Sequence, residues 1–408
     1  MERSAQKLSI RWFYLVVGII AMLFAGIIYA WSILKAPFSS EFGWTASGLA
    51  LNFTLTMCFF CLGALAGGIV SKRLGYKIPV IVAGIVAGGS FVLTSTLSGS
   101  SIVLLYLTYG VLAGFGIGAA YNVILSTVSA WFPDKKGLCS GALLMGFGAS
   151  ALILGNLAGS FIENPAIGWR TTYAILGVAL GVVLILVGLI LRRPAADMVF
   201  PAPKAAKATG GEAFEARDYT TAEMLRRPSF WMAFLCIVFL AAVGNSVISF
   251  ARDLSLSVGA AASLATTLVG VLSVCNGLGR IITGALFDTV GRRKTMLAAN
   301  LLTIGAAAVT LVSVLISSLP LCVIGLCLTG LSYGSCPTVT ASFTAAFYGT
   351  KYYPTNFGLM NFNLMGASFM ATASSALLTA TSGYMAPFAM LLCLAVVALI
   401  LNLCIRRP

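Results

Sequence analysis

The sequence predicts an all-α integral membrane protein with twelve transmembrane helices in two sets of six. Of its 408 residues, 59% are hydrophobic and only 9% are charged, a balance typical of polytopic membrane proteins and not of soluble domains. The apolar residues gather in runs long enough to cross a bilayer as helices. One long polar segment, residues 194–228, divides these runs into two equal groups.

The first apolar run, from Trp12 to Leu34, is about as long as a spanning helix and exceeds a typical signal-peptide core. We therefore expect it to be a retained first span. The twelve expected spans are 12–34, 46–70, 78–98, 102–131, 138–162, 170–191, 229–251, 260–286, 295–317, 319–347, 356–380 and 384–405. They predict an N-terminal bundle over residues 1–193 and a C-terminal bundle over residues 229–408.

The polar segment 194–228 is expected to be a cytoplasmic linker. It is rich in Ala, Lys, Pro and Glu, a composition that cannot bury a core, so most of it should be mobile. Its end is different, because Thr220 and Glu223 have the spacing of a helix capping box before the amphipathic stretch Met224 to Arg227. This pattern predicts a short helix lying at the membrane interface.

The net charge of +14 could indicate a nucleic-acid partner, but its distribution argues against one. Of the 25 Lys and Arg residues, all but Lys35, Arg170, Arg252 and Arg280 fall in alternate connecting segments. This is the positive-inside pattern of a multi-pass protein of the plasma (inner) membrane, with both termini in the cytoplasm.

Residue types that support metal or cofactor chemistry are scarce. The chain has ten cysteines and no histidine, and the single CxxC, Cys58 and Cys61, has no second pair. We expect packing roles for these thiols, no metal site and no cofactor. No GxxxxGK[ST] nucleotide-binding pattern occurs either. With no histidine and no carboxylate in mid-membrane, the chain is not expected to be an enzyme and has no catalytic residues.

The two halves share a repeated motif. Gly67 to Lys77 follows the second span and Gly284 to Lys294 follows the eighth. Both begin with glycine and apolar residues, continue through a short polar turn to a second glycine, and end in cations. A duplicated six-span unit is the arrangement expected of a two-bundle transporter.

The second copy reads GALFDTVGRRK and resembles the loop 8–9 motif of the major facilitator superfamily, whereas the first has Ser71 where that family usually carries Asp. The resemblance covers the whole chain. It implies two pseudo-symmetric bundles around a central cavity that opens alternately to each side of the membrane. It also implies that Asp288, Arg292 and Arg293 are gating residues and not ligands.

A narrower resemblance rests on three stretches in combination: YAWS from Tyr29, GFGIGAAYN from Gly114 leading into WFPDKKG, and EMLRRPSFW from Glu223. Together they resemble the oxalate/formate-antiporter branch of the superfamily, related to the monocarboxylate transporters. Arg280 stands where that branch carries an arginine in span 8.

Arg280 is the main candidate for substrate binding. An arginine within the membrane costs from about 2.5 to more than 10 kcal/mol, depending on its access to water. None of the eleven acidic residues falls in mid-membrane, because Asp288 lies at the cytoplasmic end of span 8 and Asp253 at the outer end of span 7. A structural ion pair or a snorkelling side chain is the alternative. A carboxylate substrate in a wet cavity fits better, because guanidinium binds both carboxylate oxygens.

The number of buried cations bears on the substrate. The resemblance leads us to expect a second cation in span 11 of oxalate exchangers, and alignment on Asn356-Phe357-Gly358 puts Leu364 at that position. A dianion would therefore leave net charge in a low dielectric. This favours a small monocarboxylate such as lactate or pyruvate, with oxalate/formate-type exchange as the alternative.

Further candidates for substrate contact are polar or aromatic residues in the spans that usually line the centre: Tyr29, Tyr121, Asn122 and Tyr333. Each could instead be a helix–helix contact. Asn276 lies one turn before Arg280 on the same helix face and could orient the guanidinium. Animal monocarboxylate transporters carry an acid at that position and a lysine in span 1, so the proton route stays open here.

These observations predict a secondary active transporter of small monocarboxylates, coupled to protons and working by alternating access, with the chain acting as a monomer. Asp253 is the candidate for proton coupling, and the other possibility is that the proton is carried by the substrate. A passive channel is a remote alternative, because the duplicated halves and gate-like loops favour alternating access.

Overall fold

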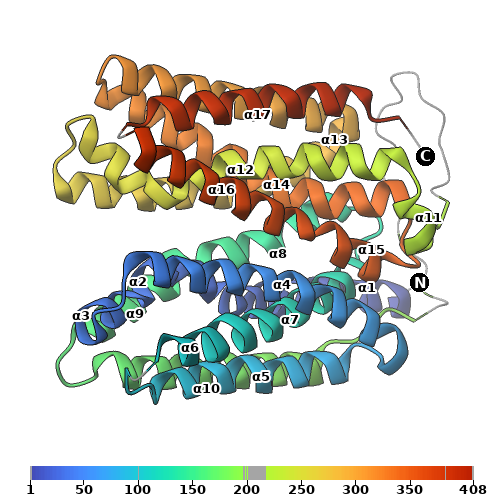
Figure 1. The fold of residues 1–408 in the computed structure, drawn as a ribbon. Coiled ribbons are helices and arrows are strands. Elements are labelled where there is room, and N and C mark those ends of the chain that lie inside the picture. The colour runs from blue at the N-terminus through green and yellow to red at the C-terminus, as the bar shows by residue number, and fades with distance from the viewer. Residues whose placement is uncertain are drawn as a thin grey trace. The chain divides into compact units, whose positions relative to one another are not determined.

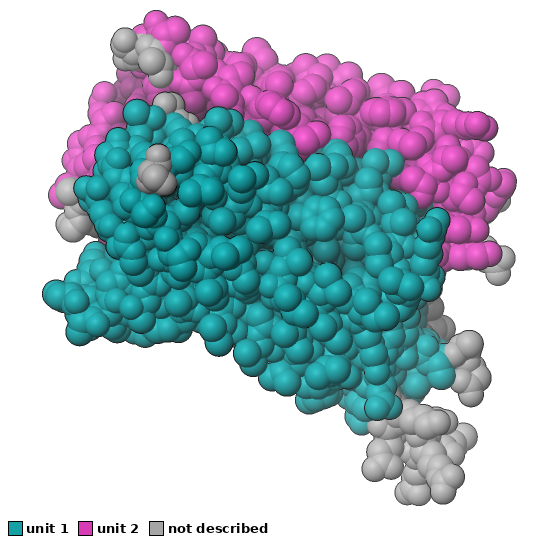
Figure 2. Space-filling view, turned by 60° about the horizontal axis from the view of Figure 1, so that its bottom comes forward, with its two compact units in different colours: residues 1–139, 146–204, 353–362 teal, residues 140–145, 205–352, 363–408 magenta. Residues whose placement is uncertain are grey.

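The computed structural model describes residues 2–99, 101–195, 198, 200, 217–381 and 383–406. Every regular element in this part of the chain is helical, and Figure 1 shows their order. Most of the predicted linker, including Lys204 and Lys207, lies outside the described residues. The chain divides into two compact units, which Figure 2 colours separately.

Unit 1 consists of residues 1–139, 146–204 and 353–362, and unit 2 of residues 140–145, 205–352 and 363–408. Two short segments belong to a different unit from the residues on either side of them. Residues 140–145, at the start of the fifth predicted span, belong to unit 2, and residues 353–362, at the start of the eleventh, belong to unit 1.

The helices of unit 1 correspond to the first six predicted spans, with interruptions, and α15 corresponds to the start of the eleventh. The first span combines α1 with a 3₁₀ turn, and the fourth and fifth each contain a π-helical segment. The elements are α1 (Glu2–Ala25), η1 (Gly26–Ala30), α2 (Trp31–Leu34), α3 (Ala36–Phe42), α4 (Ala46–Leu74), α5 (Lys77–Ser95), α6 (Ile102–Leu105), η2 (Tyr106–Ala113), α7 (Gly114–Ser129), α8 (Lys136–Ser150), η3 (Ala151–Gly155), α9 (Asn156–Glu163), α10 (Gly168–Ile190) and α15 (Tyr353–Met360).

The helices of unit 2 are α11 (Thr221–Leu225), α12 (Pro228–Ser257), α13 (Ala262–Leu315), α14 (Leu319–Tyr348), α16 (Phe362–Thr381) and α17 (Met385–Cys404). The predicted capping box is present, since Thr220 and Glu223 bond each other's backbone N–H groups at the start of α11. The eleventh predicted span begins earlier than expected and is interrupted between α15 and α16.

The eighth and ninth predicted spans form one 54-residue element, α13. It is too long for a single crossing of a bilayer. The chain turns within it at Gly291, where φ is 77° and ψ is 172°. Gly75, in the first copy of the repeated motif, has nearly the same conformation, φ 75° and ψ −179°. Because this region of the Ramachandran plot is essentially restricted to glycine, the second glycine of each motif copy sets the turn.

Ten helical segments of the described chain are long and apolar enough to cross a membrane, and one of them, Thr267–Leu315, has the length of two crossings. The prediction of a multi-span helical membrane protein is confirmed, whereas the count of twelve is not fixed by this criterion. Exposed apolar residues also recur at helical spacing, as on α10, where Val178 is 59%, Val182 49%, Leu186 50% and Leu189 55% exposed. Such a stripe suits contact with lipid.

Each unit has its own interior. In unit 2, α12 contributes Val243, Val247 and Phe250 to an apolar core that also takes side chains from α13, α14 and α17, including Leu272, Leu326 and Phe388. Because both the exposed helix faces and the interior of each unit are largely apolar, buried polar side chains are candidates for a functional role.

Candidate functional site

Arg280 is the largest fully buried side chain of the described chain, with 1% of its surface exposed. Its Nε donates a 3.2 Å hydrogen bond to Oδ1 of Asn276, one turn earlier on α13, and Nη1 donates to the main-chain carbonyl of Leu144. Among the described residues, no carboxylate lies within ion-pair distance of the guanidinium. Both partners are neutral, so within the described chain the positive charge is hydrogen-bonded but not compensated.

Close approach of two other helices explains this burial. A Cβ atom on Gly334 of α14 would lie 2.1 Å from the Asn276 carbonyl oxygen and 3.0 Å from the Arg280 nitrogen. A Cβ on Gly141 of α8 would lie 2.6 Å from the Arg280 carbonyl oxygen. Glycine at both positions lets these backbones pack directly on the turn that carries the arginine. The sequence led us to expect Arg280 in a wet cavity. In this structure its side chain is instead enclosed by protein, with 1% of its surface exposed.

The guanidinium retains donor capacity inside this enclosure. Arginine carries N–H groups on three nitrogens, and the structure gives Nη2 no hydrogen-bond partner among the described residues. A buried cation that lacks a carboxylate is costly, and an anion is the group that offsets this cost best. Chemically, the arrangement is an anion-binding group already oriented by an amide and a carbonyl.

Tyr333 and Asn276 both belong to unit 2, on α14 and α13. Tyr333 is 3% exposed, and its hydroxyl donates a 2.8 Å hydrogen bond to Oδ1 of Asn245 on α12. Nothing in the sequence pattern indicated Asn245, because a single amide in an apolar run is more often a helix contact. The hydroxyl and this amide form a neutral polar pair in the unit that contains Arg280.

The other three candidates for substrate contact lie in unit 1. Tyr121 is 2% exposed and belongs to an aromatic cluster with Phe60, Phe147 and Phe357, with ring centroids 5.0 to 6.0 Å from its own. Tyr29, in η1, is half-buried and packs edge-on against Phe147 at 5.3 Å. Each ring is thus part of an aromatic contact within the unit.

Asn122 is completely buried in α7. Its Nδ2 donates to the main-chain carbonyls of Ala64 on α4 and Pro354 on α15, the latter at 2.8 Å. Its Oδ1 has no partner among the described residues. The amide therefore ties three helices of unit 1 together through its nitrogen, while its oxygen remains a free acceptor.

The expected gating residues belong to the turn after the first half of α13. Asp288 is half-buried, and the Arg292 guanidinium lies over the Phe347 ring of α14 at 4.7 Å. Arg293 is exposed. In the first motif copy Ser71 is buried, and its hydroxyl donates to the Gly68 carbonyl of its own helix.

Asp253, the candidate for proton coupling, is exposed and lies one turn before the end of α12. No ion pair involves it among the described residues. The structure thus provides a solvated carboxylate there and brings no cation to it.

One buried ion pair escaped sequence reasoning. Arg11 of α1 and Asp134, in the connection between α7 and α8, lie 2.9 Å apart with side chains only 9% and 7% exposed. The Arg11 guanidinium also lies 5.0 Å from the Phe132 ring centroid. In the sequence, Arg11 counted only toward the charge pattern of the connecting segments. An acid inside the cation-rich stretch WFPDKKG was the available signal that Asp134 had a specific partner.

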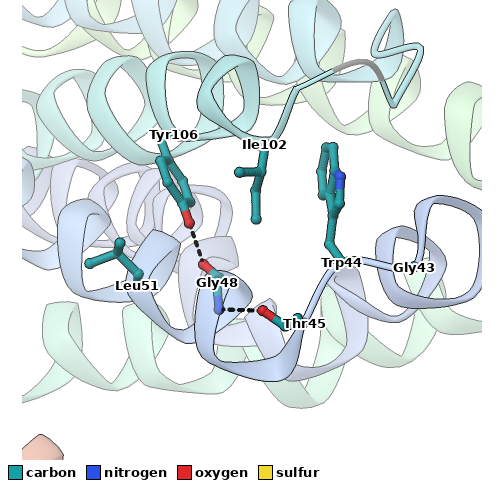
Figure 3. Close-up of a pocket in the computed structure, with 7 residues that line it drawn as sticks. All are labelled: Gly43, Trp44, Thr45, Gly48, Leu51, Ile102 and Tyr106. Carbon is teal, nitrogen blue, oxygen red and sulfur yellow. Dashed lines mark hydrogen bonds between the residues drawn. The ribbon is translucent and has the colours of Figure 1, made fainter.

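An open pocket of about 490 Å³ lies at the start of α4 (Figure 3). Trp44, Leu51, Ile102 and Tyr106 line it, and none of the predicted site residues does. Two of its polar groups are already paired, since the Tyr106 hydroxyl donates to the Gly48 carbonyl and the Thr45 hydroxyl accepts from the Gly48 N–H. With no charged lining residue, this pocket does not suit an anion.

Comparison with known proteins identifies the family. The sequence model of the Major Facilitator Superfamily matches residues 14–254 and 234–408. The chain belongs to the major facilitator superfamily. Members of this superfamily are transporters and not enzymes, so the chain is a multi-pass membrane transporter.

Relatives of this superfamily member agree with the resemblance in its motifs. The chain is 32% identical over 303 residues to the oxalate:formate antiporter of Oxalobacter formigenes, covering 72% of this chain and 67% of the relative. It is 31% identical to the uncharacterized MFS-type transporter YhjX of Escherichia coli, covering 70% and 68%. Monocarboxylate transporter 12 of Xenopus laevis is 26% identical, with 67% and 61% covered. The predicted branch is confirmed.

Solved structures of the superfamily share the fold. The transporter FucP in its outward conformation matches with a TM-score of 0.70, 14% identity and 97% of this chain covered against 99% of FucP. The proton:xylose symporter XylE matches with a TM-score of 0.72, also at 14% identity, covering 98% and 96%. At this identity the likeness concerns the fold alone.

Proposed function

We propose that the chain is a secondary active transporter of small monocarboxylates of the lactate or pyruvate type, coupled to protons and working by alternating access. The observation that carries this proposal is Arg280, a buried guanidinium hydrogen-bonded only to an amide and a carbonyl, with no carboxylate at ion-pair distance among the described residues. A substrate carboxylate supplies the missing negative charge and accepts the unused N–H groups.

Each of the other candidates has a place in this proposal. Asn276 holds Nε and so fixes the plane of the guanidinium. Tyr333 offers a phenol that already bonds Asn245 and can accept from a hydroxy acid. Tyr29, Tyr121 and Asn122 have packing roles within unit 1 in this proposal, and substrate contact through the free Oδ1 of Asn122 is the alternative.

Charge balance favours one carboxylate over two. Leu364 on α16 is 6% exposed, so the position that we expect to carry a second cation in oxalate exchangers is apolar and buried here. Exchange of the oxalate/formate type is the second candidate function, and it is favoured by the 32% identity to an oxalate:formate antiporter. A dianion at Arg280 would leave one negative charge unpaired in a low dielectric.

The deciding experiment is uptake and counterflow of labelled lactate, pyruvate, formate, acetate and oxalate in proteoliposomes. Monocarboxylates should be accumulated and should compete with one another, whereas oxalate should not compete. Leu364→Lys should weaken monocarboxylate uptake and admit dicarboxylates, with Leu364→Met as the control of similar volume. Tight oxalate binding by the unmodified protein would favour the exchanger, and flux without saturation or counterflow would favour a channel.

Proton coupling is the second part of the proposal. The bound carboxylate neutralises Arg280, so closure is easiest with substrate bound. The transported proton is additional, and its carrier is Asp253, exposed near the end of α12, with the carboxyl group of the substrate as the alternative. The test is lactate uptake with an inward proton gradient, with and without a protonophore, in wild type and Asp253→Asn. Accumulation should require the gradient. If dissipating it changes nothing, the transporter is a uniporter or exchanger. The proposal also places both termini in the cytoplasm, as the charge pattern predicts.

A further inference from the structure

The start of α12 combines an exposed cation with an exposed apolar stripe. Arg226 is exposed two residues before the helix begins at Pro228. Trp231, in the first turn, is 51% exposed, and its indole Nε1 donates a 2.9 Å hydrogen bond back to the Leu225 carbonyl. One turn further along the same face, Leu235 is 39% exposed. The indole nitrogen is thus held at the carbonyl of the residue before Arg226, and Leu235 extends the exposed apolar surface one turn into α12.

The peptide that carries Arg226 is firmly attached to unit 2. Tyr219 is 4% exposed, and its main-chain N–H donates a 3.0 Å bond to the Tyr348 carbonyl at the end of α14. Oδ1 of Asp218 accepts hydrogen bonds from the main-chain N–H groups of Thr350 at 2.9 Å and Lys351 at 3.1 Å. Together with the capping box of α11, these bonds fix the segment that leads into α12, so the exposed groups keep a defined position.

The carboxylates of this segment are already used. Glu223 caps α11 and lies 3.5 Å from the Arg217 guanidinium, and Asp218 binds main-chain N–H groups. The guanidinium of Arg227 lies over the Tyr219 ring at 5.5 Å. Among the described residues, Arg226 has no carboxylate within ion-pair distance. An exposed cation with no carboxylate partner among the described residues therefore lies where the exposed apolar residues of α12 begin.

We propose that Arg226, Trp231 and Leu235 form a binding site for an anionic phospholipid. The lipid phosphate pairs with Arg226, the indole lies at the level of the headgroup and glycerol, and an acyl chain follows Leu235 along the helix. A soluble anion would contact only Arg226, whereas a lipid contacts both Arg226 and the apolar residues Trp231 and Leu235. Because the segment is tied to the end of α14, bound lipid stabilises unit 2 at that end.

The test uses the full-length protein purified in detergent, titrated with phosphatidylglycerol or with phosphatidylcholine of identical chains. Phosphatidylglycerol should raise the melting temperature at lower concentration than phosphatidylcholine. Arg226→Gln should weaken the phosphatidylglycerol response about fivefold, the effect of one cation near an anionic headgroup. Arg226→Lys should preserve it. Arg252→Gln, an exposed arginine near the other end of α12, is the matched control and should respond like wild type.

Two results would overturn the proposal. Inorganic phosphate at equal concentration should not shift the melting temperature, and a shift equal to that of the lipid would mean a site for a soluble anion. An unchanged, lipid-selective response in Arg226→Gln would mean that the lipid binds elsewhere. Counting bound lipids by native mass spectrometry gives an independent readout, with one tightly held phosphatidylglycerol expected in wild type and a lower occupancy of that lipid in Arg226→Gln.

Discussion

Asn122 in unit 1 and Arg280 in unit 2 are both buried and both donate hydrogen bonds to main-chain carbonyls of other helices. They differ in charge, because the amide is neutral and the guanidinium is positive. Each reaches main-chain oxygen on a helix distant in sequence: Asn122 bonds Ala64 and Pro354, and Arg280 bonds Leu144. Glycines crowd both, since Cβ atoms on Gly68 and Gly358 would lie 3.1 and 2.8 Å from Nδ2 of Asn122. A neutral amide is sufficient to tie helices together. The charge of Arg280 is therefore not needed for packing, which argues for a ligand.

The largest effect on transport should come from replacing Arg280, the charged member of this pair. Arg280→Lys keeps the charge but loses the planar fork that pairs with a carboxylate. Monocarboxylate uptake in proteoliposomes should fall about a hundredfold, the range expected when a buried charge-assisted contact is lost. The purified variant should remain folded by gel filtration and circular dichroism. Uptake at the wild-type rate in a well-inserted Arg280→Lys protein would exclude the carboxylate clamp.

The sequence revealed Arg280 because a cation within an apolar run is costly wherever it lies. Asn276 could be predicted as its neighbour, since four residues on one helix share a face. Leu144 could not, because its contribution is a main-chain carbonyl, which every residue has, brought close by a contact 136 positions apart. The enclosure of the arginine escaped prediction for the same reason: it depends on which glycines meet which turns.

The fold itself was more accessible than the site. Hydropathy located the spans and the repeated motif located their turns, and Gly75 and Gly291 indeed share one backbone conformation. The π-helical segments η2 and η3 and the break between α15 and α16 left no pattern in the composition. Pairs such as Tyr333 with Asn245, and Arg11 with Asp134, require the positions of separate helices, which local periodicity does not contain.

A smaller effect should follow from moving the turn that carries Arg280 without altering its chemistry. Gly334→Ala would place a Cβ 2.1 Å from the Asn276 carbonyl oxygen, so α14 must shift away from α13. Such overpacking costs about 1–3 kcal/mol, and uptake should fall about tenfold with a lower melting temperature. Gly305→Ala is the matched control, because nothing lies within 4 Å of its Cβ. Equal behaviour of the two variants would mean that the close approach does not matter.

Asn122→Ala tests the neutral member of this pair, and it should affect stability more than transport. It removes one amide that bonds two carbonyls, a loss of about 1–2 kcal/mol between membrane helices. The melting temperature should fall by a few degrees, while the half-saturating concentration for lactate changes less than about threefold. A large rise in that concentration at unchanged thermal stability would instead identify the free Oδ1 of Asn122 as a substrate contact.

The smallest expected effect lies at a charged pair far from both donors. Glu41 bonds Arg170 at 2.8 Å and the Trp169 indole N–H, and these hydrogen bonds, the Arg170 contact foremost, hold the pKa of its carboxyl below the usual range. Because this pKa is lower in the folded protein than in the unfolded one, where it is near 4.3, the ionised carboxyl stabilises the fold at pH values above the unfolded-state pKa. This stabilisation is lost as the pH falls through the folded-state pKa.

Because the Glu41 side chain is 41% exposed, solvent weakens the pair, and Glu41→Gln should lower the melting temperature at pH 7 by only about 1 °C. The difference from wild type should shrink as the pH is lowered below about 4, where the wild-type carboxylate becomes protonated. Scanning calorimetry between pH 3 and pH 7 measures it, with Glu163→Gln as a control whose carboxylate has no ion pair among the described residues. A difference that stays constant with pH would show that Glu41 acts through the shape of its side chain and not through its charge, leaving Arg280 as the one test of charge in this comparison.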